Sequence, residues 1–519
     1  MIVLRQGNII QPTYDSTGNK ITGITNPDNS LSSLGSPVYI IGNFTYGSTL
    51  TATLAPGWVV TGYQWTRDGV DISSATSSTY TLVAADIGKT ISVKVTGLSF
   101  IGTDGKSVLY TGPDLLRYAT PYNKIASGSI SAASGEKRIA GRLFRPIGSS
   151  AKKSLQVVAN NFYLSGTTAV TNPTNAITVI GVYLEYNNVS KQITWGGNGT
   201  PSFSGGTRNQ ISDKVYPSDF GLAQFSRDLS GYLRYELSCP NGGVLPVSEG
   251  RESVSLAFQY DASANSCTNL SSTGALQWTN GQPSSAFEPP LLIVGEDVTT
   301  SSDGRAWLFV GDSIVAQGGD NSYLHTATRG SGSSYISACS FAKVGAIINQ
   351  ALNNNSVLAD FVKYANGVVD EYHTNSVAGS TLTDMQNACL SLWSNVRAAA
   401  SAHPLARTLI VGRTALLNRT TDATGASVLT SDWNAGGKVE QLNDWFATKV
   451  GSGVEFYMAN LMDSPTLVRR GSTTKGVLDS DYYKWPNAYT ADGTHPNSTS
   501  ASPTTGLGGN ARVYLLANA

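Results

Sequence analysis

The chain has 519 residues, 40% hydrophobic and only 13% charged, and that charged fraction is half the roughly 25% of an ordinary globular protein. This length exceeds what one hydrophobic core supports, so we expect several domains. The formal net charge of +0 gives no electrostatic basis for binding nucleic acid or an anionic membrane, and the absence of an apolar run of about 18 residues argues against a transmembrane helix.

The N-terminal region, residues 1–42, is polar and without periodicity, which predicts an extended attachment segment. It lacks a basic stretch followed by an apolar one, so no standard secretory signal is expected. Short alternating strands fill residues 43–112, with Trp65 in a strand and Asp68-Gly69 in a turn. These residues resemble a bacterial immunoglobulin-like module with Trp65 as its core tryptophan. No cysteine precedes Cys239, so the inter-sheet disulfide of antibody domains is not expected.

Residues 113–300 continue as strands separated by turns rich in Gly, Asn and Ser. This texture predicts a second, accessory β-sandwich of jelly-roll type. Strand aromatics such as Tyr183 and Trp195 either stack on sugar rings or fill the core, and we expect core. Two interpretations of Cys239 and Cys267 stay open, a disulfide and two free thiols.

Residues 301–519 alternate strands with helices. Apolar residues at helical spacing predict helices over 356–364, 385–400 and 437–450. Continuous apolar runs predict strands over 306–310, 408–412 and 454–458. Such alternation predicts a parallel sheet with helices on both faces. The expected fold is therefore multidomain, with two all-β domains followed by an α/β domain.

Two short peptides in this last region carry the chemistry. Ser313 ends a Gly-Asp-Ser sequence that directly follows the predicted strand 306–310, which is where an α/β sheet displays a nucleophile. Asp492 lies three residues before His495, close enough for the carboxylate to orient the imidazole. A serine, a base and an orienting acid are the parts of nucleophilic acyl transfer.

With this order and texture, residues 305–519 resemble the SGNH (GDSL-type) hydrolases. The resemblance implies that Ser313 is the nucleophile, His495 the general base and Asp492 its orienting acid, and Pro496 fits the same context. It implies carboxylic ester hydrolysis without a metal or organic cofactor. The four cysteines are also too few and too spread for a zinc site.

The resemblance also implies an oxyanion hole. Its donors would be the backbone N–H groups of Ser313 and Gly345 with the side-chain amide of Asn375, and Gly379 is an alternative to Gly345. Here this chain departs from the family's Gly-x-Asn-Asp block: it has His373 where the family has Gly and Ser376 where the family has Asp.

Three side chains near these blocks are candidates for substrate binding, with loop packing as the alternative: His373, Tyr483 and Trp485. The leading β-modules and the polar, uncharged composition resemble phage tail or receptor-binding proteins with an esterase head. We therefore expect a virion or extracellular enzyme that removes O-acetyl groups from a bacterial surface polysaccharide. Its N-terminal segment would contact other tail proteins, and a homo-oligomer stays open.

Two other functions fit the same residues. One is a glycan-binding tail protein without catalysis. The other is a bacterial lipolytic or general carboxylesterase, which would prefer long acyl chains to acetyl.

Overall fold

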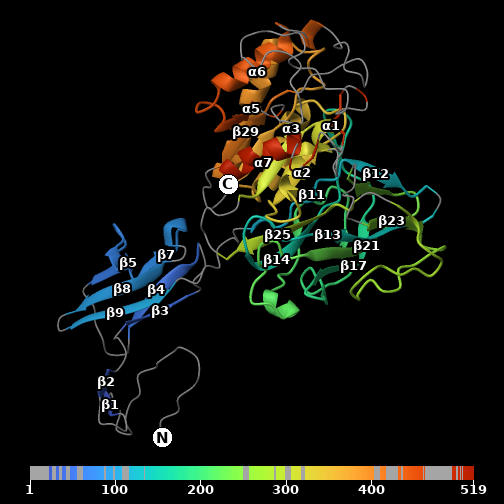
Figure 1. Cartoon of the computed structure of the whole chain (residues 1–519). Helices are drawn as coiled ribbons and strands as arrows, with labels where there is room; N and C mark the ends of the chain where they lie inside the picture. The colour runs from blue at the N-terminus through green and yellow to red at the C-terminus, as the bar shows by residue number, and fades with distance from the viewer. Residues whose placement is uncertain are drawn as a thin grey trace. The chain divides into compact units, whose positions relative to one another are not determined.

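The computed structural model describes most of residues 38–107 and 116–518, together with the strand residues 23–25 and 31–33 (Figure 1). The longer stretches outside the description are 1–22, 26–30, 55–61, 108–115, 249–255, 299–304, 317–321, 403–408, 417–430 and 462–491. Two compact units divide the chain, residues 1–114 and residues 115–519.

The first unit contains two antiparallel sheets and a small hairpin. One sheet has the order β3-β4-β7 and the other β6-β5-β8-β9, and the hairpin is β1-β2. Their bounds are Gly23–Thr25 (β1), Leu31–Ser33 (β2), Val38–Ile41 (β3), Thr49–Leu54 (β4), Gly62–Arg67 (β5), Val70–Asp71 (β6), Thr79–Thr81 (β7), Thr90–Gly97 (β8) and Phe100–Ser107 (β9), with a 3-10 turn at Ala84–Asp86.

Trp65 is the centre of this unit, as the sequence predicts. Its side chain is fully buried among residues of both sheets, including Leu50 and Val93. The indole Nε1 donates to the carbonyl of Ser77 at 2.9 Å, so its polar atom is satisfied inside the core. Asp68 and Gly69 both have positive φ, 48° and 82°, and form the tight turn between β5 and β6.

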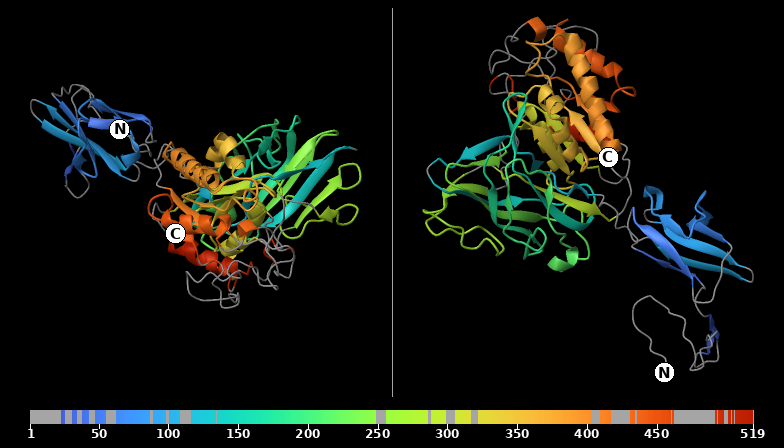
Figure 2. Two further views of the ribbon diagram at one scale, coloured as in Figure 1. Left: turned by 90° about the horizontal axis from the view of Figure 1, so that it is seen from above. Right: turned by 180° about the vertical axis from the view of Figure 1, so that it is seen from behind.

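The second unit begins with two further antiparallel sheets (Figure 2). The larger has the order β18-β17-β21-β13-β23-β24, with β19 beside β17, and the smaller has the order β10-β25-β14-β20. The larger sheet's strands are Lys137–Phe144 (β13), Ile177–Tyr186 (β17), Val189–Gln192 (β18), Ser202–Phe203 (β19), Gly231–Cys239 (β21), Leu256–Asp261 (β23) and Ser284–Ser285 (β24). The smaller sheet's strands are Leu116–Tyr118 (β10), Lys152–Ala159 (β14), Gln210–Ile211 (β20) and Leu291–Asp297 (β25).

These two sheets enclose one apolar core, to which Val157 and Ile293 of the smaller sheet and Leu184 and Leu233 of the larger contribute. Two short ribbons accompany them, β12 (Gly128–Ser131) with β22 (Val244–Val247) and β15 (Tyr163–Ser165) with β16 (Ala169–Thr171), and a 3-10 turn at Pro217–Phe220. All four cysteines are free thiols, so Cys239 and Cys267 do not form a disulfide.

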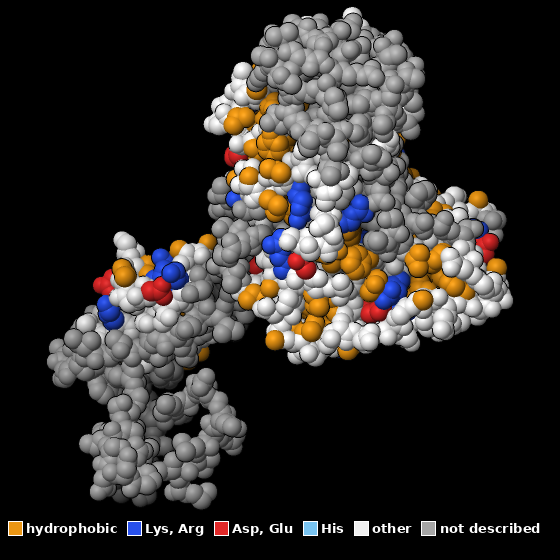
Figure 3. Space-filling model, viewed as in Figure 1, with side chains coloured by type: hydrophobic (Ala, Val, Ile, Leu, Met, Phe, Trp, Pro, Cys, Tyr) orange, Lys and Arg blue, Asp and Glu red, His pale blue; other side chains and the backbone are white. Residues whose placement is uncertain are grey.

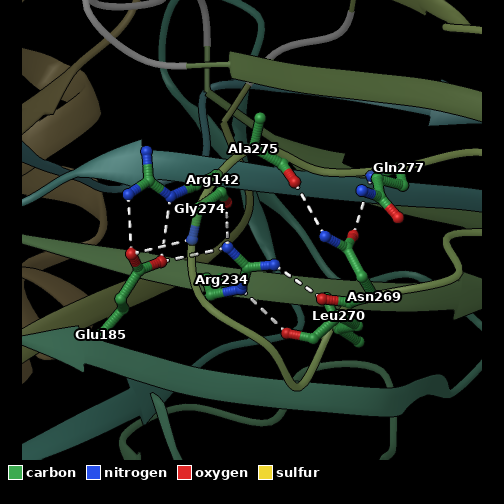
Figure 4. Close-up of polar contacts among 8 residues, drawn as sticks. All are labelled: Arg142, Glu185, Arg234, Asn269, Leu270, Gly274, Ala275 and Gln277. Atoms are coloured by element: carbon green, nitrogen blue, oxygen red, sulfur yellow. Dashed lines mark hydrogen bonds and ion pairs between the residues drawn. The ribbon is translucent and has the colours of Figure 1, made fainter. Parts of the chain in front are cut away.

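A polar cluster fastens a loop onto the larger sheet (Figure 4). The carboxylate of Glu185 accepts from Arg142 at 2.9 and 2.7 Å and from Arg234 at 3.0 Å. Arg234 also donates to loop carbonyls at Asn269 and Leu270, at 2.7 and 2.9 Å, and to Gly274. The loop is closed on itself because Asn269 donates to Ala275 O and accepts from Gln277 N. We call Arg142, Glu185 and Arg234 the Glu185 cluster.

The rest of the second unit is an α/β arrangement around a six-stranded sheet. Its order is β11-β27-β26-β28-β29-β30, and every described pairing in it is parallel. The strands are Asn123–Lys124 (β11), Trp307–Gly311 (β26), Ala338–Ala342 (β27), Gly367–Asp370 (β28), Ile410–Thr414 (β29) and Phe456–Met458 (β30). The helices are Ser313–Ala316 (α1), Tyr323–Arg329 (α2), Asn349–Asn353 (α3), Asn355–Val362 (α4), Leu382–Ser401 (α5), Lys438–Thr448 (α6) and Leu507–Ala517 (α7), with a 3-10 turn at Ser431–Trp433.

Helices cover both faces of this sheet, as expected for parallel strands. Alternate residues of β26 enter different cores: Leu308 and Val310 pack with α4, α5 and α6, whereas Trp307 and Phe309 pack with α1, α2 and α7. The predicted strands and helices of this region are present with ends shifted by a few residues. Helix α5 begins where Thr381 and Asp384 form a capping box. No described helix is long and apolar enough to cross a membrane.

The predicted boundary at residue 300 falls inside the second unit. Strand β11 pairs with β27 and so adds an edge to the α/β sheet from a point far earlier in the chain. Tyr118 donates through Oη to Phe361 O at 2.8 Å, and Val158 and Leu292 share a core with Leu308. The β-rich and α/β parts are therefore one body, which a two-residue strand without periodicity does not reveal in the sequence.

Candidate active site

Ser313 lies at the carboxyl end of β26, in the turn from that strand into α1. Asp312 caps the turn, because its Oδ1 accepts from Ile314 N at 3.1 Å and its carbonyl accepts from Ala316 N at 2.9 Å. A strand followed at once by a capped helical turn holds the serine backbone in one conformation. The nucleophile predicted from the sequence therefore lies at the edge of the sheet where α/β proteins place their sites.

Three side chains form a continuous chain of hydrogen bonds at this edge. His495 Nε2 is 2.8 Å from Ser313 Oγ, and His495 Nδ1 is 2.7 Å from Asp492 Oδ2. The first of these contacts joins residues 182 positions apart. The structure thus brings together the serine, the imidazole and the carboxylate that the sequence singled out.

Asp492 is held by more than its contact with the imidazole. Its Oδ1 accepts from the backbone N–H groups of Thr494 at 2.9 Å and His495 at 2.8 Å. Desolvation works against the charged form, but the hydrogen bonds from the imidazole and from these two amides lower the pKa of Asp492 to about 2. The carboxylate is therefore ionised at neutral pH and accepts from Nδ1–H, which leaves Nε2 to accept the serine proton.

The two loops beside Ser313 carry the predicted oxyanion donors. Gly345 follows β27 and Asn375 follows β28, the strands on either side of β26. Asn375 Nδ2 donates to Ala346 O at 3.1 Å, so the two loops meet across the end of β26. Gly345 has φ +77°, and a methyl group built on it would contact nothing within 4 Å. Gly379 lies in an exposed turn beyond Asn375.

His373 occupies the position where the family block has glycine. Its φ of 109° is one that glycine adopts freely and other residues rarely adopt, so the backbone keeps the glycine-like turn. The imidazole is fully buried and its Nε2 is 3.0 Å from Cys389 Sγ on α5. Burial lowers the pKa of His373 well below its usual value. Of the two alternatives for His373, substrate contact and loop packing, its burial against α5 favours packing.

The other two candidates for substrate binding, Tyr483 and Trp485, lie outside the described residues. Among the described residues, no three His, Cys, Asp or Glu side chains gather as metal ligands would. The contacts among Ser313, His495 and Asp492 support serine nucleophilic attack with imidazole as base.

Four buried charged side chains beneath Ser313 were not singled out from the sequence. Asp312, Asp370, Glu371 and Arg413 are all at most 3% exposed, and we call them the acidic cluster. Arg413 Nη1 is 3.7 Å from Asp370 Oδ1, and Trp393 Nε1 donates to Asp370 Oδ2 at 2.9 Å. The available signal was a pair of acids, Asp370 and Glu371, ending an apolar strand.

No family model and no curated protein matches the chain. Solved structures with partial likeness include Est24, a carbohydrate acetylesterase from Sinorhizobium meliloti (14% identity, TM-score 0.29, covering 41% of this chain and 99% of that one). Others are Axe2, an acetylxylan esterase from Geobacillus stearothermophilus (14%, 0.24, 41% and 94%), and the C-terminal catalytic domain of the peptidoglycan O-acetyltransferase OatA from Streptococcus pneumoniae (13%, 0.26, 41% and 94%). Likenesses with TM-scores below 0.5 do not establish a function for this chain.

Proposed function

We propose that the protein is a serine ester hydrolase of the SGNH type. The observation that carries this proposal is the unbroken contact from Ser313 Oγ through the His495 ring to the Asp492 carboxylate. A serine hydroxyl is a weak nucleophile until a base removes its proton, and here the base lies within hydrogen-bond distance.

The reaction would proceed in two halves. His495 Nε2 takes the proton of Ser313 as Oγ attacks the ester carbonyl, and the imidazolium returns that proton to the leaving alcohol when the C–O bond breaks. Water then attacks the acyl-serine as His495 takes a proton from it, and His495 gives that proton to Ser313 Oγ when the bond from Oγ to the acyl carbon breaks and the carboxylic acid leaves. Asp492 stabilises the imidazolium in both halves through Nδ1–H.

Charge on the carbonyl oxygen would be met by three donors: the N–H groups of Ser313 and Gly345, and the Nδ2 amide of Asn375. One hydrogen of that amide is directed to Ala346 O, and the other stays available for an oxyanion. The contact with Ala346 fixes the amide in place before substrate arrives, which is what electrostatic preorganisation requires.

For the substrate we propose acetyl esters on a bacterial surface polysaccharide, with the protein acting in a phage tail or outside a cell. The β-rich region built onto the α/β sheet and the small first unit support a role in attaching to a large substrate. Only 13% of the residues are charged and the net charge is +0, and charged side chains lie among many uncharged ones on the described part of the face in Figure 3, which suits a neutral glycan better than a polyanion.

Acetate release tests this proposal. Acetylated capsular or lipopolysaccharide glycan is incubated with the full chain and with Ser313→Ala, and acetate is measured against time. We expect release by the wild type alone. Equal release by both proteins, or release only from esters with long acyl chains, contradicts the proposal.

A second candidate function, glycan binding without catalysis, is favoured by one departure from the family block, Ser376 in place of Asp. A fluorophosphonate probe separates the two functions. It labels an activated serine covalently, so a hydrolase is labelled in the wild type and not in Ser313→Ala, whereas a binding protein is labelled in neither.

A further inference from the structure

Two buried carboxyl groups of the acidic cluster lie beside the nucleophile, at the carboxyl ends of two neighbouring strands. Asp312 follows β26 and Glu371 follows β28, which lie side by side in parallel. Glu371 Oε2 accepts from Asp312 N at 3.2 Å, and Glu371 N donates to Val310 O at 2.8 Å. A Cβ built on Gly311 would lie 2.6 Å from Glu371 Oε2. Glycine at 311 is therefore what lets this carboxyl lie under the turn that carries Ser313.

The one buried positive charge described nearby, that of Arg413, acts on both Asp370 and Glu371. Arg413 lies against Asp370 and donates through Nη2 to Tyr372 O, which holds the backbone just before the loop of Asn375. The other polar and titratable groups that face the two carboxyls from the surrounding elements are Tyr323 of α2, Tyr372, Thr374 and His495. The described neighbours thus include three buried acids against one buried arginine.

Burial shifts the ionisation of both carboxyls toward higher pH. Burial raises the pKa of Asp312 to about 6, and burial together with the charge of Asp312 raises the pKa of Glu371 well above its usual value. Two carboxyls this close in a site without solvent do not both ionise, and they titrate as a pair.

We propose that Asp312 and Glu371 share one proton at neutral pH and that this neutralised pair holds the nucleophile turn in its reactive geometry. The protonated Glu371 donates to the Asp312 carboxylate while its other oxygen accepts from Asp312 N–H. Glu371 is a positioning residue, since it acts on Ser313 through Asp312. When alkali removes the shared proton, a second negative charge appears beneath the place where the oxyanion develops. The role in turnover rests on the proposed function, whereas the proton sharing is a property of the fold.

The pH dependence of stability tests the sharing without using activity. A carboxyl whose pKa is raised by folding keeps a proton that the unfolded chain has lost, so folding stability falls as pH rises above the ordinary value of about 4.3. Glu371→Gln keeps the acceptor for Asp312 N–H and has no proton to lose. In calorimetry of the full chain from pH 4.5 to 8, we expect the Tm of the wild type to fall relative to that of Glu371→Gln.

The matched control is Glu440→Gln, which removes another buried carboxyl of the same unit, on α6 and away from the pair. Because this variant keeps both Asp312 and Glu371, the fall of Tm between pH 4.5 and 8 should persist in it. If Glu371→Gln fails to fold, Asp312→Asn replaces it, since asparagine keeps the acceptor for Ile314 N–H and the same relative change in Tm is expected. Parallel Tm curves for the wild type and the folded variant overturn the proposal.

The pH profile of kcat/KM with p-nitrophenyl acetate tests the positioning role. In the wild type kcat/KM should fall at alkaline pH. In Glu371→Gln we expect this fall to begin about one pH unit higher, because glutamine cannot acquire the second negative charge. Coincident alkaline limbs overturn the positioning role even where the Tm curves differ. A wild type that neither hydrolyses the ester nor reacts with the fluorophosphonate refutes the proposed function instead, and the Tm comparison still decides whether the proton is shared.

Discussion

The Glu185 cluster and the acidic cluster lie in the same unit, and both consist of buried charges, but their balance is opposite. In the first, two arginines surround one carboxylate, and the surplus donors of Arg234 are directed to loop carbonyls. In the second, three carboxyls share one arginine. Burial opposes ionisation of Glu185, but hydrogen bonds from Arg142 and Gly274 lower its pKa, whereas those of Asp312 and Glu371 are raised.

This contrast separates two uses of buried charge. A carboxylate surrounded by arginines stays ionised over the whole neutral range and fixes a loop in one position. Carboxyls in excess of their cations keep a proton that they can lose near neutral pH. The first arrangement suits a scaffold, and the second lies one residue from the proposed nucleophile.

The largest expected effect removes the chemistry and leaves the scaffold intact. Ser313→Ala should lower kcat for ester hydrolysis by a factor of about 10⁴ or more, because no other group replaces the nucleophile. Its Tm should stay close to that of the wild type. Ser391→Ala, on the exposed side of α5, is the control and should keep full activity in the same p-nitrophenyl acetate assay. Residual turnover in Ser313→Ala above a tenth of the wild type would contradict the triad.

Asn375→Ala tests whether the loops beside β26 act on the transition state. Loss of one oxyanion donor typically costs about 10²–10³ in kcat, with little change in KM. The control is Asn387→Ala, an exposed asparagine of α5. Steady-state kinetics that show a raised KM with unchanged kcat would instead place the Asn375 amide in ground-state binding.

The scaffold side of the comparison is tested by Arg234→Met. The variant leaves three loop carbonyls and part of Glu185 without their donor, and breaking a buried ion pair in this way costs about 3–5 kcal/mol of folding stability. Urea unfolding measures this loss. Arg397→Met removes an exposed pair with Glu455 and should cost at most about 1 kcal/mol. Loss of kcat in folded Arg234→Met would mean that the Glu185 cluster also serves the site.

The smallest expected effect is that the Tm changes with pH in opposite directions for the two clusters. Because the pKa of Glu185 is lowered by folding, its contribution to stability is complete above about pH 4.3, the ordinary glutamic acid value, and is lost as pH falls through the native pKa. Relative to Glu185→Gln, the wild type should therefore lose Tm on acidification below pH 4.5. The carboxyls behind Ser313 predict the opposite, a loss as pH rises. The same sign in both comparisons would show that the two clusters do not differ as argued.

The sequence predicts the triad residues well because each lies in a local pattern. Ser313 directly follows an apolar strand, and Asp492 and His495 are three residues apart. The alternation of strands and helices predicts a parallel sheet, and such a sheet offers one edge at which Ser313 and His495 can meet. The chain order of Gly345 and Asn375 likewise agrees with strands that lie on either side of β26.

The residues that sequence reasoning did not find depend on which strands become neighbours. Glu371 contacts Asp312 because β28 lies next to β26, and Arg413 reaches Asp370 because β29 lies next to β28. Strand order leaves no mark on the spacing of apolar residues, so these contacts could not be predicted. The inward orientation of His373 depends in the same way on where α5 packs.

The pairing of β11 with β27 has a consequence for how this protein can be divided. A fragment that starts at residue 301 would uncover one border of the α/β sheet and the apolar surface that Tyr118, Val158 and Leu292 now cover. Open sheet borders of this kind invite pairing with other chains and aggregation. A fragment that keeps this border paired and this surface covered must therefore include residues from both sides of position 300.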